Sequence, residues 1–339
     1  MDLDKLNKIL KNEPAYRIKQ AYAFIFKDLV DNWDKATNLP SDLRQKLNKE
    51  FPLDINAKVL EAKTKESQKA LLTLDDDSKI ETVLLKHEDG RNTVCVSSQV
   101  GCPLGCLFCA TGKMGFERNL SEWEIVQQVL FFSRELKKRG ERVSNLVFMG
   151  MGEPFLNYDN VMSAIKLLND KDSLNIGARH ISISTIGITE GIKKLASEKL
   201  QINLAISLHA PNNELRGKIV PMNQEYPLES IFKIVDLYMQ KTNRQVMFEY
   251  LLINDFNDSQ SEAMELIDLL KKLNKSLFVI NLISYNPTQG FKPSPNWKIK
   301  EFKDVLIRSK IKVTERHRFG QDIKAACGQL AGESCKFNS

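Results

Sequence analysis

The sequence predicts an α/β protein built as a partial (β/α)6 barrel with a small N-terminal helical accessory domain. Two observations support this fold class. Short apolar strand patterns alternate with amphipathic helical patterns through most of the chain, which is typical of a parallel sheet covered by helices. About six such units fit between residue 94 and the C-terminus, fewer than the eight of a closed barrel, so we expect a partly open one.

The N-terminal residues predict helices. Helical patterns cover residues 4–10, 16–29 and 41–49, and prolines separate them. We therefore expect helix to dominate up to about residue 70, and we place a helical accessory domain at residues 1–72.

A hairpin is predicted to follow. Residues 80–85 and 93–97 have strand patterns, and the polar turn Glu88-Asp89-Gly90 lies between them. We interpret residues 73–98 as a hairpin and linker that leads into the barrel core at 99–339.

The elements of the core alternate regularly. Strands are predicted at 145–149, 180–184, 203–207, 246–251, 278–283 and 312–315, and helices at 121–138, 159–168, 188–194, 228–240, 259–273 and 299–309. Ser121 followed by Glu124 forms a capping box, in which two side chains satisfy free backbone donors at a helix start. Trp33, Trp123 and Trp297 are interpreted as packing residues.

Composition restricts the class of protein. The chain has 339 residues, of which 42% are hydrophobic and 27% charged, enough to bury a substantial core. It contains no uncharged apolar run of about 18 residues and no signal-peptide pattern at its start, so we expect a cytoplasmic protein with no membrane partner. The net charge of +6 mildly favours a polyanionic partner without identifying one.

Three of the six cysteines form a compact motif. Gly101-Cys-Pro-Leu-Gly-Cys-Leu-Phe-Cys-Ala110 places Cys102, Cys106 and Cys109 in a Cys-x3-Cys-x2-Cys spacing after a predicted strand. Three thiolates on one loop suit three irons of a [4Fe-4S] cluster and leave the fourth iron open for a ligand. Structural zinc, the main alternative, usually takes a fourth Cys or His, and neither His87 nor His180 lies in the loop.

The sequence resembles a known family. The cysteine loop is the signature of radical S-adenosylmethionine (SAM) enzymes. Together with Cys95-Val-Ser-Ser-Gln-Val-Gly-Cys102, Phe148-Met-Gly-Met-Gly-Glu-Pro154, Ser207-Leu-His-Ala-Pro211 and Gly320-Gln-Asp-Ile-Lys-Ala-Ala-Cys-Gly-Gln-Leu330, it resembles the RlmN/Cfr family of RNA adenine methyltransferases over residues 13–333. The resemblance implies a radical SAM barrel that uses a [4Fe-4S] cluster, held by the three cysteines, and SAM.

The resemblance also implies the SAM contacts. They are Gly152, Glu153, Ser184, Ser207, Leu208, His209 and Asn286. From the residues alone, the Gly152-Glu153 pair is equally a tight turn with a solvated carboxylate, and a histidine after a strand is more often structural. Ser184 and Ser207 end neighbouring predicted strands, and we expect them at the same end of the sheet as the cysteine loop.

Three further residues receive catalytic roles from the resemblance. It implies that Cys327 is methylated by one SAM, and that a radical from a second SAM activates this methyl group for addition to adenine. Cys95 then attacks the Cys327 sulfur, which leaves a redox-active disulfide, and Glu81 takes the ring proton. Glu81 has an ordinary alternative as a solvent-facing residue of an alternating strand. Cys335 matches nothing in the family pattern and is interpreted as an incidental thiol.

The implied function is methylation of carbon 2 of adenine in 23S rRNA, at the peptidyl-transferase centre, and in tRNA, beside the anticodon. The accessory domain is expected to bind RNA, a flavodoxin system to supply electrons, and the protein to act as a monomer. The competing function within the family is Cfr-like methylation of carbon 8. Pro154 after the Gly-Glu pair favours carbon 2. Outside the family, the residues are weighed against a non-methylating radical SAM enzyme and a non-catalytic RNA-binding protein.

Overall fold

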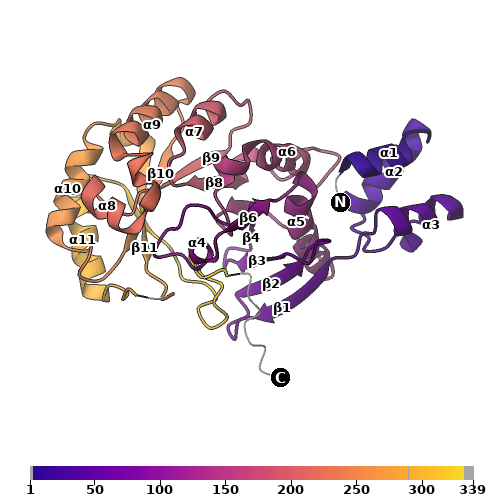
Figure 1. The fold of residues 1–339 in the computed structure, drawn as a ribbon, viewed down its shortest axis with the longest axis horizontal. Coiled ribbons are helices and arrows are strands. Elements are labelled where there is room, and N and C mark those ends of the chain that lie inside the picture. Colours follow the sequence, from indigo (N-terminus) through magenta and orange to yellow (C-terminus); the bar gives the residue numbers. More distant parts are fainter. Residues whose placement is uncertain (1–2, 289, 332–339) are drawn as a thin grey trace.

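The fold is a single open sheet that curves inside a layer of helices. The computed structural model describes residues 3–288 and 290–331, and the order of the main sheet is β1-β2-β3-β4-β7-β8-β9-β10-β11-β12 (Figure 1). The two end strands do not pair with each other, so the barrel is open, as predicted. Cys335 lies outside the described residues.

The sheet changes character at β4. From β4 onward all neighbours pair in parallel, whereas β1, β2, β3 and β4 pair in antiparallel fashion. The parallel strands are β4 (Asn92–Cys95), β7 (Asn145–Phe148), β8 (Ile181–Thr185), β9 (Asn203–Ser207), β10 (Val246–Leu252), β11 (Phe278–Ser284) and β12 (Val313–Glu315). Their carboxyl ends therefore meet at one rim, where parallel α/β folds hold their ligands.

Helices follow most parallel strands and cover the outside of the sheet. They are α5 (Glu122–Lys137), α6 (Tyr158–Asn169), α7 (Thr189–Leu195), α8 (Asn213–Ile219), α9 (Leu228–Thr242), α10 (Gln260–Leu270) and α11 (Asn296–Arg308), and short 3₁₀ turns lie at 154–157, 178–180, 221–224 and 275–277. A further 3₁₀ turn, at 33–35, lies in the N-terminal part. The capping box at Ser121 and Glu124 is present at the start of α5. Helix α8 was not predicted, because its sequence Asn-Glu-Leu-Arg-Gly-Lys-Ile is mostly polar and contains a glycine, so it shows no clear apolar period.

The N-terminal part is helical only as far as residue 50. Helices α1 (Leu3–Leu10), α2 (Ala15–Phe26) and α3 (Ser41–Glu50) gather at one end of the molecule, opposite α10 and α11 (Figure 1). The expectation of helix up to about residue 70 is wrong, because residues 56–61 and 67–73 form strands.

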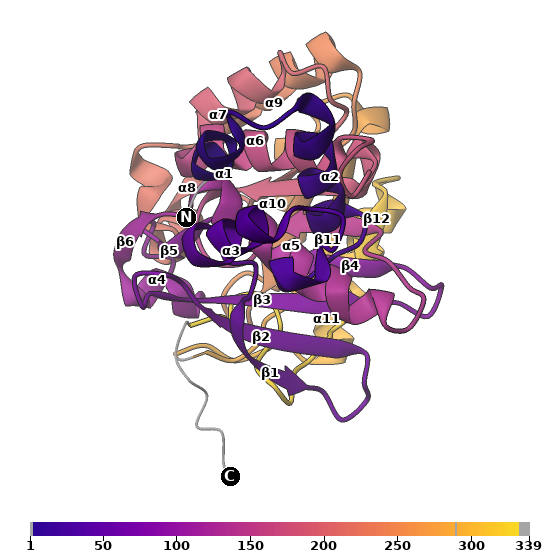
Figure 2. The same cartoon turned by 90° about the vertical axis from the view of Figure 1, so that its right-hand side faces the viewer.

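These strands extend the main sheet. β1 (Asn56–Glu61), β2 (Ser67–Thr73) and β3 (Lys79–Lys86) lie side by side and continue it beyond β4 (Figure 2). The expected domain boundary at residue 72 thus falls inside β2. The predicted hairpin around Gly90 is β3 and β4.

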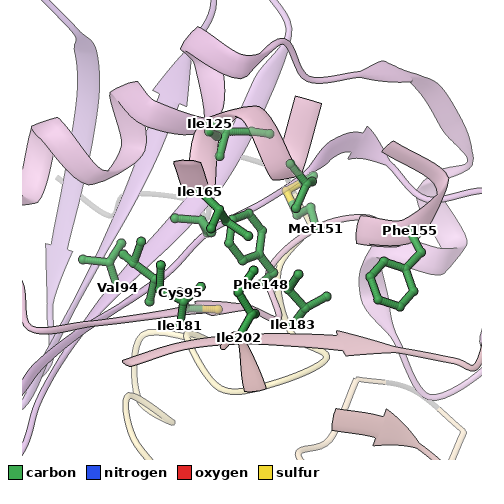
Figure 3. Packing of buried hydrophobic residues seen from close by; sticks show 14 of the residues in the cluster. Val94, Cys95, Ile125, Phe148, Met151, Phe155, Ile165, Ile181, Ile183 and Ile202 are labelled. Atoms are coloured by element: carbon green, nitrogen blue, oxygen red, sulfur yellow. The ribbon is translucent and has the colours of Figure 1, made fainter. Parts of the chain in front are cut away.

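The main core lies between the sheet and its helices. Val94, Phe148, Ile181 and Ile183 of the strands pack with Ile125 of α5 and Ile165 of α6, and Cys95 lies at the border of this cluster (Figure 3). Trp33 and Trp123 are fully buried, as predicted, but Trp297 is 59% exposed, and its interpretation as a packing residue is wrong. No helix among residues 3–288 and 290–331 is long and apolar enough to cross a membrane.

A small second sheet supports the cysteine loop. β5 (Gln99–Gly101) pairs with β6 (Phe116–Asn119), and the short helix α4 (Ala110–Met114) lies between them in sequence. Gly101 has a φ of +73°, and a Cβ there would overlap the Gly115 carbonyl oxygen. That same oxygen accepts a hydrogen bond of 2.8 Å from the Cys102 amide. Only glycine allows this close approach, which fixes the start of the loop.

Candidate active site

One pocket lies at the carboxyl ends of the parallel strands. It gathers most of the residues that the sequence singled out. Cys102, Cys106, Cys109, Gly152, Glu153, Ser184, Ser207, His209 and Cys327 all line it. Residues more than 200 positions apart in the sequence thus share one cavity, and the expectation that Ser184 and Ser207 share the rim of the sheet with the cysteine loop is confirmed.

The three loop cysteines are free thiols on one side of this pocket. Burial raises the pKa of Cys102 to about 12, and burial together with the neighbouring Cys109 and Cys102 raises that of Cys106. The buried guanidinium of Arg216 opposes this shift at Cys106. Three thiolates this close together and this dry require a cationic group between them.

Arg216 also ties together the loops that follow β8 and β9. Its Nε donates to the Leu208 carbonyl at 3.0 Å, and its Nη2 donates to the carbonyls of Ile186 and Ser207. Burial lowers its pKa to about 10, which still leaves a cation at neutral pH. Leu208 itself is fully buried and points its backbone, not its side chain, toward this network, so it does not line the pocket.

Gly152 and Glu153 approach the pocket from the loop after β7. Gly152 has a φ of +100°, and a Cβ there would overlap the Gln99 side chain. The Glu153 carboxylate accepts backbone hydrogen bonds from Phe155 and Ile186, both at 3.0 Å. Burial raises the pKa of Glu153 to about 7, because two amides compensate its charge only in part. The free lone pairs of this carboxylate suit a cationic amino group.

His209 is a neutral ring in the wall of the pocket. Burial, helped by Arg216, lowers its pKa to about 3. Its Nδ1 accepts a hydrogen bond from the Leu251 amide at 3.2 Å, so the ring proton is on Nε2. Phe108 of the cysteine loop packs edge-on against the ring, with 4.8 Å between centroids. His209 therefore connects the strand ends to the loop.

A polar chain crosses the floor of the pocket. The Ser184 hydroxyl donates to Glu249 at 2.6 Å and lies 3.2 Å from that of Ser207. Glu249 forms an ion pair of 3.0 Å with Arg316. Sequence analysis missed Glu249, Arg316 and Arg216. Glu249 could have been found, because it is a carboxylate within the apolar strand 246–251, and a charged residue in a buried strand needs a partner.

Arg316 lies near Cys95 and Cys327, the other two cysteines of the part of the chain that the structure describes. The Cys327 thiol is the main cause that raises the pKa of Arg316, and Cys95 contributes as well. Burial raises the pKa of both thiols, that of Cys95 to about 12, while Arg316 opposes the shift at each. Cys95 and Cys327 are not joined by a disulfide, although each lies within electrostatic range of the other.

A second, smaller pocket meets the first at Cys327. Cys95 and Asn286 line only this second pocket, whereas Cys327 and Arg316 line both. The Asn286 amide donates to the Cys327 carbonyl at 3.2 Å, and its buried oxygen has no hydrogen-bond partner. Cys327 thus stands between the cysteine loop and Cys95.

Glu81 lies beneath the Cys327 segment and outside both pockets. It is 2% exposed, so the alternative of a solvent-facing residue is wrong. Its carboxylate pairs with Lys69 at 2.9 Å and accepts the Ala331 amide at 2.8 Å.

The donor set fits a [4Fe-4S] cluster better than a single ion. Among residues 3–288 and 290–331, no three His, Cys, Asp or Glu side chains converge where one metal ion could sit. A cubane has a different requirement, since each thiolate binds its own iron. The three free thiols that share one pocket meet it, and the Glu153 carboxylate in the same pocket supplies an acceptor for an amino acid ammonium.

Comparison with known proteins defines the class. The profile described as "Radical SAM superfamily" matches residues 96–270. A crystal structure of a radical SAM methyltransferase from Sphaerobacter thermophilus is 40% identical, superposes with a TM-score of 0.93 and covers 98% of both chains. This protein is therefore a radical SAM enzyme of the methyltransferase type.

The family within that class follows from curated relatives. A protein of Dictyoglomus thermophilum named "Probable dual-specificity RNA methyltransferase RlmN" is 49% identical over 97% of this chain and 94% of its own length. One of the same name from Streptococcus pyogenes is 41% identical over 96% of this chain and 92% of its own. The chain belongs to the RlmN family, whose enzymes use a [4Fe-4S] cluster and SAM.

The loop cysteines generate the first prediction. Cys102→Ala, Cys106→Ala and Cys109→Ala proteins, each reconstituted anaerobically, should lose the cluster and SAM cleavage, because every thiolate binds a separate iron. Iron and sulfide analysis measures this loss. Cys95→Ala is the matched control, since it makes the same change outside the loop and should keep full iron content. A Cys106→Ala protein with full iron would overturn the assignment.

Proposed function

We propose that this protein methylates carbon 2 of an adenine in 23S rRNA, at the peptidyl-transferase centre, and in tRNA, on the 3′ side of the anticodon. The observation that carries the proposal is the position of Cys327, which lines the cluster pocket and has Cys95 on its other side. The words "dual-specificity RNA methyltransferase" in the relatives' names support two RNA substrates.

Cys327 has the chemistry of a methyl carrier. Carbon 2 of adenine is too weak a nucleophile to take a methyl group from SAM, whereas a thiolate displaces it readily. When bound, the cluster and SAM supply the methyl group and the hydrogen-abstracting radical. Arg316 stabilises the Cys327 thiolate that must form first, because it opposes the effect of burial on the pKa of the thiol.

Cys95 and Glu81 complete the release of product. The methylene carbon that joins Cys327 to the ring must leave its sulfur. Attack of the Cys95 thiolate on the Cys327 sulfur forms a disulfide, and the electron pair of the broken carbon–sulfur bond goes to the carbon, which takes a proton to become methyl. Glu81 accepts the proton that the ring carbon loses, and the unpaired electron that radical addition leaves on the ring would pass back to the bound cluster. An external thiol then reduces the disulfide.

Product analysis tests the position of methylation. RNA from cells that lack the enzyme, treated with reconstituted protein, SAM and reductant, should yield 2-methyladenosine in both rRNA and tRNA. Mass spectrometry and NMR of the nucleosides identify the carbon. Methylation of carbon 8 would support a Cfr-like activity. RNA that remains unmethylated while SAM is cleaved would support a non-methylating enzyme.

The positions of Cys327 and Cys95 generate the second prediction. A Cys95→Ala enzyme should accumulate a covalent protein–RNA adduct through Cys327, since nothing attacks the sulfur, and its product formation should fall by at least about 100-fold. Cys327→Ala should form neither methylcysteine nor adduct. Denaturing gels and peptide mass spectrometry measure both species. Normal turnover of Cys95→Ala with no trapped RNA would refute the mechanism.

We extend the proposal to the partners. Helices α1 to α3 lie at one end of the molecule and carry exposed lysines, which suits an accessory surface for the RNA phosphate backbone. A flavodoxin-type protein would supply electrons, and the enzyme would act as a monomer in the cytoplasm. Sedimentation and reduction assays with flavodoxin test these points.

The accessory surface generates the third prediction. Replacing the exposed Lys8, Lys11 and Lys19 together with Glu should weaken RNA binding by at least about tenfold at moderate salt, because phosphate contacts are lost and repulsion is added. RNA-independent SAM cleavage should not change. The control replaces the exposed Lys193, Lys233 and Lys300 of α7, α9 and α11, with the same change in charge. Equal RNA binding by both variants would exclude the helices as the RNA surface.

A further inference from the structure

Strand β2 carries a lysine in a buried position, where lysines are rarely found. Lys69 of β2 is 3% exposed, although a buried ammonium is costly unless it is paired. Its Nζ lies 2.9 Å from Oε1 of Glu81, which is itself 2% exposed. A pair this dry adds little to stability compared with apolar side chains of the same volume. Its presence beside the Cys327 segment therefore points to a role in the reaction.

Strand register places this pair on the face of the sheet that carries Cys95. Lys69 pairs with Val83 and Leu71 with Glu81, so Lys69 and Glu81 are diagonal neighbours on one face of the sheet. Val83 also pairs with Cys95, and because side chains alternate along a strand, Cys95 lies on that same face. Lys69 therefore lies on the same face of the sheet as Glu81 and Cys95, the two residues proposed to release the product.

The pair also contacts the Cys327 segment on both sides of the cysteine. Lys69 Nζ donates to the Lys324 carbonyl at 3.3 Å, and Glu81 Oε2 accepts the Ala331 amide at 2.8 Å. One carboxylate oxygen is therefore held by the ammonium and the other by the segment. The carboxylate cannot rotate without breaking one of these bonds.

We propose that Lys69 is the positioning residue for Glu81: its ammonium holds one oxygen of the carboxylate and keeps the carboxylate aimed at the site where the adenine ring loses its proton. This inference rests on the proposed role of Glu81 as the proton acceptor. A carboxylate as buried as Glu81, left without the ammonium, loses the ion pair that offsets its desolvation and one of the two contacts that fix its orientation. Lys69 itself does not touch the ring.

The experiment separates methyl loading from product release. Lys69→Met keeps the length and apolar stem of the side chain and removes its charge. The variant should methylate Cys327 within about twofold of wild type, while product formation falls by about 100-fold, the usual effect of losing a general base. The covalent protein–RNA adduct should accumulate. Peptide mass spectrometry of Cys327 and denaturing gels of labelled RNA measure these quantities.

A second lysine of the same sheet supplies the matched control. Lys86 of β3 lies 3.9 Å from Glu61 at the surface, and Lys86→Met should leave loading and product unchanged. Glu81→Gln and the double variant Lys69→Met/Glu81→Gln complete a cycle. If Lys69 acts only through Glu81, the double variant is no slower than Glu81→Gln alone. The double variant also removes both buried charges at once, so it reports on Lys69 even where the single variant fails to fold.

The outcomes distinguish this inference from the proposed function. Wild-type product formation by Glu81→Gln overturns the role of Glu81, and with it the inference. If Glu81→Gln traps the adduct but Lys69→Met releases product normally, only the inference fails. It also fails if Lys69→Met loses Cys327 methylation as severely as it loses product formation, or if the double variant is clearly slower than Glu81→Gln. Either result would mean that Lys69 stabilises the Cys327 segment and does not act through Glu81.

Discussion

The site depends on how the segment that carries Cys327 is held. Hydrogen bonds reach it from separate parts of the chain: Ala110 donates to the Gly328 carbonyl at 2.7 Å and Thr111 to that of Leu330 at 2.6 Å. Asn286 donates to the Cys327 carbonyl, and the Lys69–Glu81 pair of β2 and β3 binds the segment on both sides of Cys327. Ala110 and Thr111 directly follow Cys109, so the same loop that presents three thiols also positions the fourth, more distant one. The three loop cysteines and Cys327 are thereby held in place by contacts of one loop.

Buried charges of both signs surround the pocket. Arg216 lies near the loop thiols and Arg316 near Cys95 and Cys327, while Glu153 and Glu249 provide the negative groups. Each is buried or partly buried and each has hydrogen-bond partners, which offsets its desolvation. His209 is kept neutral by the same burial. Such fixed charges act strongly because little water screens them.

Local patterns explain which features were predictable from the sequence. The cysteine loop, the parallel strands and the capping box at Ser121 depend on residues close in sequence, and all appear where expected. Strands β1 and β2 were missed because their mixed polar composition shows little period. The Lys69–Glu81 pair could not be found either, since it depends on strand register. Trp297 is the opposite case: its residue type predicted burial, but in the structure its side chain is exposed.

An open sheet has two free edges, which a closed barrel avoids. Unpaired backbone at such an edge can recruit a strand from another molecule and begin aggregation. Here one edge, β1, carries the exposed charges of Lys58 and Glu61, and the other, β12, has only three residues and ends in Glu315. Charge at one edge and shortness at the other oppose such pairing. The open sheet therefore does not leave a template for edge-to-edge assembly.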